Sequence, residues 1–474
     1  MGAAMRPRAL VALLAVAASA AGCLSPSHDG NGSPSPAPSP LGMPAPACDF
    51  AHAIVDAHDH ADPALHTASC AMDLVGYTDM SEASDVGTPG GGFIDVSLAG
   101  HYAFVSNWGP GRSLSIVDVS DPQRPRHVSD FSAFPPQDVA HAGASSHWDV
   151  SAFPEGDLVV LPSQASTSAQ GDAEGASPNG GGVFLVDTED KESPYLESFT
   201  PIFDPSALVP VGVHNANALE VAGERYVAAT TANGQTILLH VEGEAGHRTL
   251  KEVSRVPGEH DTTVQRHPFT NQTLLYGCNG AFIITDISDP AKPEIVSTTP
   301  TGANLTCYHQ AVPSDVLIGG RHYTVTTTES SQGVPVPLTI LDTTDPAAPA
   351  VVGHWTIPVA LRALAGPYGF SPHNLVFEHG RLYIGHYHAG VWVVDVSTPE
   401  RIRDPVNLGF YQPHHLPPTL PRTPLGADVP AVWGVQYAHG LIYAADVNTG
   451  LYILAYTGPP SPLEDAPEYP TNLH

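Results

Sequence analysis

A short apolar run that ends in Asp recurs along this chain and constrains its fold more than any other feature. The clearest copy is Leu114-Ser115-Ile116-Val117-Asp118, which is followed by Val119-Ser120-Asp121-Pro122. An apolar, β-branched run that stops at Asp, Ser and Pro is typical of a buried strand followed by a turn. Other copies end at Asp187, Asp286, Asp342 and Asp395, and two degenerate copies end at His240 and Ala455.

Seven copies about 45–70 residues apart indicate a repeat architecture with one structural unit per copy. In each turn, the Asp side chain is expected to accept hydrogen bonds from backbone N–H groups. The run and its D-x-S-x-P tail resemble the LVIVD repeat, which occurs in cell-surface proteins of bacteria and archaea. That resemblance implies a β-propeller at the cell surface, and it implies little about activity.

An early segment is expected to close the ring of repeats. Met72–Asp79 matches the segments that follow the Asp-Pro turn in other repeats, such as Ala350–Trp355 and Val406–Tyr411, and these segments predict the outermost strand of a blade. The last repeat lacks such a segment, because Gly458, Pro459 and Pro460 follow Tyr456. We therefore predict an all-β fold over residues 72–458: a seven-bladed β-propeller of four-stranded antiparallel blades, whose last blade is completed by the N-terminal strand.

The N-terminus has the features of an export signal. Arg6 and Arg8 precede the apolar stretch Ala9–Ala21, which is too short to span a membrane as a stable helix. Ala20-Ala21-Gly22-Cys23 resembles a lipobox, in which the Cys becomes the lipidated first residue of the mature protein. We predict a signal peptide at 1–23 and a lipid anchor on Cys23 at the outer face of the cell membrane or envelope. An ordinary signal peptide with an incidental Cys is the alternative.

The remaining cysteines are Cys48, Cys70, Cys278 and Cys307. An even number in an exported chain predicts two disulfides, with sequence neighbours as the natural pairs among three possible connectivities. Residues 24–47 are rich in Ser, Pro and Gly and are expected to form a disordered tether. Residues 48–71 form a His-rich segment bounded by cysteines, and residues 459–474 are Pro-rich and acidic, which predicts a loose tail.

The charge balance limits the partners of this chain. It has 18 Lys and Arg against 48 Asp and Glu, a net charge of −30, which excludes nucleic acid because phosphate contacts require cations. Long insertions fall in the connections that share one face, and repeat proteins usually bind through such a face. We expect a monomer that binds an envelope protein, a glycan or a small ligand there. The insertions are Ser132–Ser146, Ser163–Gly182, Glu329–Pro337, Ala360–Pro372 and Pro413–Pro430.

Histidines recur where the inner strands are expected to begin: His147, His214, His260, His309 and His373, with His386 and His388 in a nearby turn. Inner strands line a propeller channel, so these imidazoles would converge at its mouth. Converging neutral imidazoles suit one Cu, Zn, Fe or Ni ion. Asp149, Asp261 and Asn374 each follow a histidine and are expected to orient the rings. The alternative is that the histidines hydrogen-bond neighbouring blades and channel water.

Short pieces such as Pro372-His373-Asn374 are similar to the selenium-binding protein/methanethiol oxidase family of seven-bladed propellers. That similarity implies a His-bound metal near the axis. It does not imply the oxidase chemistry, because no reactive Cys stands in a matching position. No G-x-S-x-G motif or other catalytic residue is evident. The sequence therefore favours a binding module, and the alternative is a metal-dependent enzyme, for example an oxidoreductase.

Overall fold

The computed structural model describes 48, 50, 69–80, 92–109, 112–133, 145–146, 149–165, 181–204, 211–231, 234–258, 260–302, 304–329, 336–358, 370–413 and 431–472. The predicted signal peptide with Cys23, the tether, most of the segment 48–71, and His147 lie outside these residues, as do the central parts of the long insertions. Among the described residues, no helix is long and apolar enough to cross a membrane.

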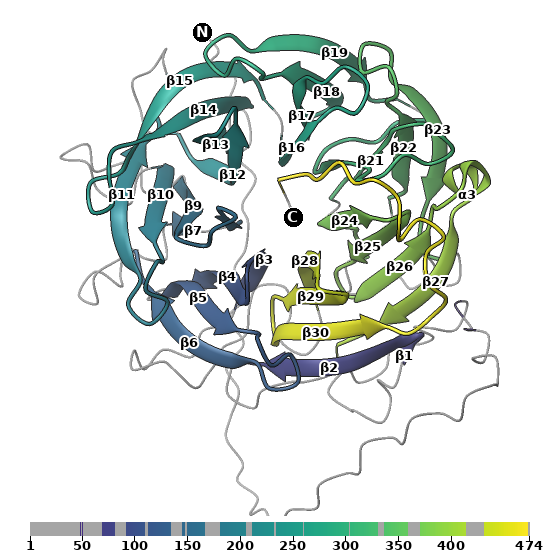
Figure 1. Cartoon of the computed structure of the whole chain (residues 1–474), viewed down its shortest axis with the longest axis horizontal. Coiled ribbons are helices and arrows are strands. Elements are labelled where there is room, and N and C mark those ends of the chain that lie inside the picture. Colours follow the sequence, from purple (N-terminus) through teal and green to yellow (C-terminus); the bar gives the residue numbers. More distant parts are fainter. Residues whose placement is uncertain are drawn as a thin grey trace, which may run out of the picture. The chain divides into compact units, whose positions relative to one another are not determined.

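Seven antiparallel sheets are arranged as the blades of a ring (Figure 1), as the sequence predicts. Blades 1 to 4 follow the chain, each running from the inner strand to the outer strand. Blade 1 contains β3 (Phe93–Ala99), β4 (Tyr102–Gly109), β5 (Arg112–Asp118) and β6 (Arg126–Phe131); blade 2 contains β7 (Ser145–Ser146), β8 (Ser151–Ala152), β9 (Leu158–Ala165), β10 (Gly182–Asp187) and β11 (Tyr195–Pro201). Blade 3 contains β12 (Val213–Val221), β13 (Glu224–Thr231), β14 (Gln235–Glu242) and β15 (Thr249–Pro257); blade 4 contains β16 (Thr262–Arg266), β17 (Thr273–Cys278), β18 (Ala281–Asp286) and β19 (Glu294–Pro300).

Blades 5 to 7 follow the same plan. Blade 5 contains β20 (Ala311–Pro313), β21 (Tyr323–Thr326), β22 (Leu338–Asp342) and β23 (Ala350–Trp355). Blade 6 contains β24 (Leu375–Glu378), β25 (Arg381–Gly385), β26 (Val391–Asp395) and β27 (Val406–Tyr411), with a short helix α3 (Pro399–Arg403) before β27 and β1 (Ser69–Cys70) beyond it. Blade 7 contains β28 (Val432–Ala438), β29 (Leu441–Asp446), β30 (Gly450–Tyr456) and β2 (Met72–Thr78).

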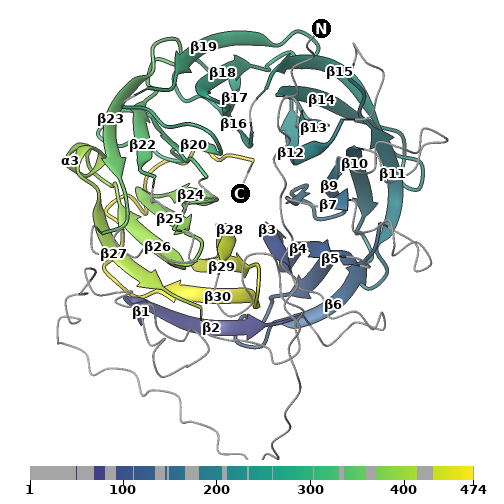
Figure 2. The same ribbon diagram turned by 180° about the vertical axis from the view of Figure 1, so that it is seen from behind.

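The predicted closure of the ring is confirmed. β2 pairs with β30, with Met72 opposite Tyr456 and Thr78 opposite Leu451, so the early strand completes the last blade. This pairing gives the last blade its fourth strand and joins the two ends of the ring. Figure 2 shows β2 beside β30 from the opposite side.

The recurring run is the third strand of each blade, and its Asp has the predicted role. Asp118 Oδ1 accepts a hydrogen bond from the backbone N of Ser120 at 3.0 Å, and Asp286 Oδ1 accepts one from Ser288 at 2.9 Å. The core lies mainly between neighbouring blades. Between blades 5 and 6, for example, the ring centroids of Trp355 and Trp392 are 6.1 Å apart.

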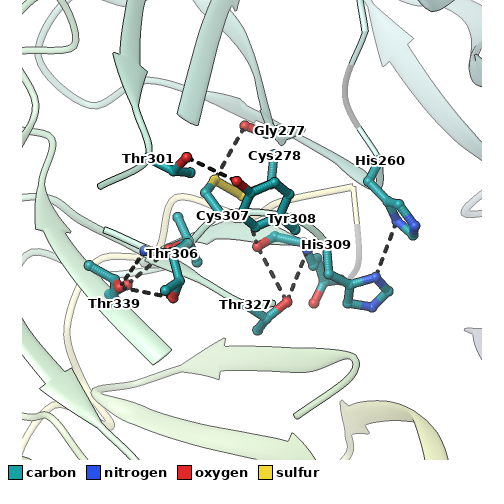
Figure 3. The surroundings of a disulfide bond; sticks show 12 residues. His260, Gly277, Cys278, Thr301, Thr306, Cys307, Tyr308, His309, Thr327 and Thr339 are labelled. Carbon is teal, nitrogen blue, oxygen red and sulfur yellow. Dashed lines mark hydrogen bonds between the residues drawn. A yellow bond between two sulfur atoms is a disulfide. The ribbon is translucent and has the colours of Figure 1, made fainter. Parts of the chain in front are cut away.

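Both predicted disulfides are present, Cys48–Cys70 and Cys278–Cys307. Cys278 ends β17 in blade 4 and Cys307 precedes β20 in blade 5, so this disulfide joins two blades (Figure 3). Two disulfides are consistent with a protein outside the reducing cytoplasm.

The ring has two distinct faces. We call the face at which β12 begins, and which carries His214, His260, His309 and His373, the mouth face. The face that carries the turns Ala222–Gly223 and His379–Gly380 is the far face.

The prediction of a loose C-terminal tail is wrong for residues 459–472, which we call the C-terminal segment. It crosses the far face from the rim to the centre of the ring (Figure 1), where the Asn472 N donates to Val264 O at 3.0 Å. Backbone hydrogen bonds to two inner-blade segments fix its path, with Tyr469 N donating to Asp315 O at 2.5 Å.

Candidate metal centre at the channel mouth

Four of the predicted histidines form a continuous series at the mouth face. The ring centroids of His214 and His260 are 4.2 Å apart, those of His260 and His309 are 4.9 Å apart, and those of His309 and His373 are 4.2 Å apart. The four residues come from blades 3, 4, 5 and 6 in that order, because each stands at or just before the start of an inner strand. The predicted convergence is therefore present for these four.

Hydrogen bonds fix the two central rings. His309 Nε2 donates to Asn374 Oδ1 at 3.0 Å, since an amide oxygen can only accept. In the neutral ring this leaves His309 Nδ1 as an acceptor, and it lies 3.2 Å from His260 Nδ1 (Figure 3). His260 Nδ1 is also 2.9 Å from Asp261 Oδ1. The predicted orienting residues Asp261 and Asn374 thus contact these rings, although Asn374 holds His309 of the neighbouring blade rather than His373.

Two overlapping sets of side chains could each hold a metal ion. One set is His260, His309 and Glu329, and the other is His214, His260 and Asp261; within each set the ligand atoms lie within 4.8 Å of one another. His260 belongs to both sets. Imidazole nitrogens combined with one carboxylate are ligands that Zn, Cu, Fe and Ni accept.

His373 lies beside these sets without belonging to either, and one of its ring nitrogens is unsatisfied. His373 Nδ1 is buried and has no hydrogen-bond partner among the described residues. Its ring lies against that of His309 on one side and stacks on Trp433 on the other, with centroids 4.8 Å apart. A buried nitrogen without a partner is costly unless it binds something.

The electrostatics keep His214 and His373 neutral and the two carboxylates charged, whereas the pKa of His260 is raised, because the Asp261 carboxylate outweighs the effect of burial. Burial lowers the pKa of His214 to about 4, and burial together with His309 lowers that of His373 to about 3. Burial acts to raise the pKa of Asp261 and of Glu329, but neighbouring imidazoles outweigh it, so both carboxyls stay below their ordinary range. Neutral imidazoles and ionised carboxylates are the forms that bind metals.

The remaining predicted ligands are not in this group. His147 lies outside the described residues. His386 is buried between blades 5 and 6, where its ring centroid lies 6.1 Å from that of Trp355 on an outer strand. His388 is buried, and its backbone carbonyl accepts a hydrogen bond from Gln412 Nε2 at 2.8 Å. The structure brings neither His386 nor His388 within ligand distance of the two sets.

Sequence reasoning missed two members of the site, Glu329 and Tyr387. The Tyr387 hydroxyl donates a hydrogen bond to Glu329 Oε1 and so orients that carboxylate. Glu329 stands at the start of an insertion in blade 5, outside the repeat pattern, so no spacing could have identified it. Tyr387 stands between His386 and His388, which were both predicted as ligands, so its position next to them could have identified it.

Below the histidines the channel narrows to a polar cavity of about 20 Å³. Its lining includes the carboxyl groups of Asp95, Asp149 and Asp261, and Asn374 Nδ2 donates to Asp95 Oδ1 at 3.1 Å. Burial raises the pKa of Asp95 and of Asp149, and in Asp149 the nearby Asp95 adds to the rise. Asn374 therefore connects the histidine series to the acidic channel wall through hydrogen bonds.

Comparisons with known proteins identify the repeat in two segments of the chain. The LVIVD repeat pattern matches residues 90–132 and 277–301. No curated protein sequence matches the chain. Among solved structures, the β-propeller domain of Cps50 (Swd1) from Myceliophteria thermophila is similar, with 12% identity, a TM-score of 0.46 and coverage of 77% of this chain and 97% of that one.

A putative 6-phosphogluconolactonase from Bacteroides fragilis is also similar, with 10% identity, a TM-score of 0.46 and coverage of 71% of this chain and 92% of that one. Neither likeness carries information on activity. The chain is thus a seven-bladed β-propeller in which two segments match the LVIVD repeat.

Proposed function

We propose that this protein is an extracytoplasmic, lipid-anchored binding module that carries one transition-metal ion at its channel mouth. LVIVD repeats in a propeller suggest a binding or interaction module. The observation that carries the metal is that His260 has ligand atoms within 4.8 Å of His214 and Asp261 on one side and of His309 and Glu329 on the other. The partner would be an envelope protein, a glycan or a small ligand that binds at the mouth face.

The metal is tested by elemental analysis of the full chain carrying Cys23→Ser, which blocks lipid attachment, purified without a His tag. After loading with Cu²⁺, Zn²⁺, Fe²⁺ or Ni²⁺ in turn and dialysis, we expect His260→Ala/His309→Ala to bind one equivalent fewer than the parent chain. The matched control is His247→Ala/His354→Ala, which removes two histidines from exposed positions elsewhere. Equal metal content in both double variants would overturn the metal centre.

A metal-dependent enzyme, for example an oxidoreductase, is the second candidate. It is favoured by the partial exposure of His214 and His260, since catalytic metals keep a coordination position that a substrate can reach. An enzyme predicts metal-dependent turnover that His260→Ala/His309→Ala abolishes. A binding module predicts ligand binding by the metal-loaded chain without turnover.

A further inference from the structure

A second group of metal-ligating side chains lies on the far face, on the opposite side of the ring from the histidine series. Asp315, Glu378 and His379 have ligand atoms within 4.8 Å of one another. Asp315 follows β20 in blade 5, whereas Glu378 ends β24 and His379 stands in the next turn of blade 6. Two neighbouring blades therefore meet at this group.

The imidazole is oriented as it is in metal sites. His379 Nδ1 lies 3.0 Å from Glu378 Oε1 and 3.8 Å from Asp315 Oδ2. The other ring nitrogen, Nε2, lies 3.1 Å from Glu468 Oε1 in the C-terminal segment. A histidine that binds a metal through one nitrogen usually donates its other N–H to a carboxylate, which fixes the tautomer and the ring direction.

Asp315 is held in place for this role. Its side chain is 2% exposed, and both carboxylate oxygens accept hydrogen bonds from the backbone N of His379, at 3.0 and 2.9 Å. These bonds hold the Asp315 carboxylate beside the His379 ring. Glu378 and His379 are 17% and 18% exposed, so an ion can reach the group from solvent.

The guanidinium of Arg381 has other partners. Arg381 begins β25, two residues after His379, but its guanidinium lies over the Tyr456 ring and 3.6 Å from Glu464. The group thus gathers three carboxylates around a single imidazole, and a divalent cation would balance this charge.

We propose that Asp315, Glu378 and His379 bind a divalent transition-metal ion, with Glu468 positioning His379 through its second ring nitrogen. Two carboxylates and one imidazole suit Zn²⁺ or Mn²⁺. The site is separate from the channel-mouth centre and does not depend on it. Because Glu468 belongs to the C-terminal segment, the ion fastens that segment to the ring. The neighbouring Tyr469 and Asn472 backbone N–H groups, which bond Asp315 and Val264, become more protected as a result.

The experiment uses the full chain with Cys23→Ser and with His260→Ala/His309→Ala, a silent background in which the channel-mouth centre no longer binds metal. Zn²⁺ and Mn²⁺ are titrated separately by isothermal calorimetry, and amide hydrogen exchange is followed at Tyr469 and Asn472. We expect one equivalent to bind and to slow exchange at both amides. Glu378→Gln removes this equivalent, and Glu468→Gln weakens binding roughly 10–100-fold, as is usual for a partner of a ligating histidine.

Glu464→Gln is the matched control, because Glu464 lies in the same segment but pairs with Arg381; it leaves the affinity unchanged. Thermal unfolding of each variant shows that the ring is intact. Absence of binding in the silent background, or equal binding by Glu378→Gln, overturns this proposal and leaves the channel-mouth centre unaffected. Failure of the channel-mouth centre appears instead as equal metal content with and without His260→Ala/His309→Ala.

Discussion

Two buried histidines in this propeller, His322 and His309, differ in what their ring nitrogens contact. His322, between blades 4 and 5, is bonded to Gln265 Oε1 at 2.8 Å through Nε2 and to Thr343 Oγ1 at 3.0 Å through Nδ1. Those are neutral partners, and they satisfy the ring. His309 instead contacts a second imidazole and lies near carboxylates. Burial alone therefore does not mark a metal ligand, and the chemistry of the partners does.

His322 makes the fold sensitive to acid. Burial and the nearby His267 lower its pKa to about 3, whereas an unfolded histidine titrates near 6.5. Between these values the unfolded chain binds a proton that the folded chain does not, so the free energy of unfolding falls as pH falls from about 6.5 towards 3. One proton corresponds to about 1.4 kcal/mol per pH unit. Above pH 6.5 this group contributes no pH dependence.

Replacement of His322 by Gln should remove this contribution. We expect urea unfolding measured between pH 4.5 and 7.5 to show a pH slope for His322→Gln that is shallower by up to one proton in the acid range. His247→Gln, at an exposed turn position, is the control and should keep the parent slope. Identical slopes for His322→Gln and the parent would show that His322 does not titrate as inferred.

Local chemistry was predictable at this scale, and contacts between blades were not. The Asp118 turn was predicted because its partner, Ser120, stands two residues away. The bond from His309 to Asn374 joins residues 65 positions apart, and no repeat spacing encodes it. Four histidines could be placed at the mouth because each precedes an inner strand. Glu329 could not, because it stands in an insertion.

At the scale of elements, the same irregularity recurs in every blade. The register between the third and outer strands shifts once in all seven sheets, for example between Ile340 and Leu341 opposite β23. A bulge bends and twists the outer strand locally. Beside it, outer strands of blades 5 and 7 carry a glycine that faces the turn of the next blade. A Cβ on Gly353 would lie 1.9 Å from Ile402 O, and one on Gly76 would lie 1.9 Å from Pro122 O.

The close approach of the next blade explains why these outer-strand segments share a glycine. The V-V-G-x-W and L-V-G-Y segments identified the outer strand correctly, yet the close approach of the next blade becomes evident only from the packing. The outer strand of blade 6 was predicted at Val406–Tyr411, where the structure has it, because apolar runs and turn residues are local signals. The approach of the α3 backbone to β23, in contrast, is a contact between blades, and local signals do not predict it.

Gly353→Ala should therefore weaken the junction between blades 5 and 6. The added methyl group has no room unless α3 moves, and such overpacking typically costs about 1–3 kcal/mol. Gly302→Ala is the matched control, because a Cβ there would meet no atom within 4 Å; it should change stability by less than about 0.5 kcal/mol. Urea unfolding of both variants is the measurement. Equal stability of the two would contradict the proposed close contact.

At the scale of the whole molecule, the ring and the channel are closed by different parts of the chain. The ring closes through β2 and β30, before the C-terminal segment begins. The segment then follows the far face to the channel, where Asn472 lines both the polar channel cavity and a cavity of about 850 Å³ on the far face. Repeat counting could predict the seven blades and their closure. It could not predict this path, because single polar contacts without periodicity determine it.

A chain that ends at Gly458 should consequently keep its ring and lose the C-terminal segment that covers the channel on the far face. β30 and β2 remain paired, so we expect the seven-bladed fold to persist with a lower melting temperature. Val264 N donates to Asn472 Oδ1 at 2.7 Å, and Asn472 Nδ2 donates to Ala218 O at 3.3 Å, so truncation exposes Val264 N to solvent. Hydrogen exchange at Val264 should accelerate, while exchange in the paired strand β26 stays unchanged.

Asn472→Ala distinguishes the contribution of the Asn472 side chain from that of the rest of the C-terminal segment. It removes these side-chain bonds and leaves residues 459–471 in place. We expect this variant to accelerate exchange at Val264 without changing the contacts of Arg381 with Pro459 and Glu464. If Val264 exchanges at the parent rate in both the truncated chain and Asn472→Ala, the segment does not close the channel in solution. If exchange at Val264 accelerates only in the truncated chain, the backbone of the C-terminal segment protects Val264 rather than the Asn472 side chain, since the Asn472 N also bonds Val264 O.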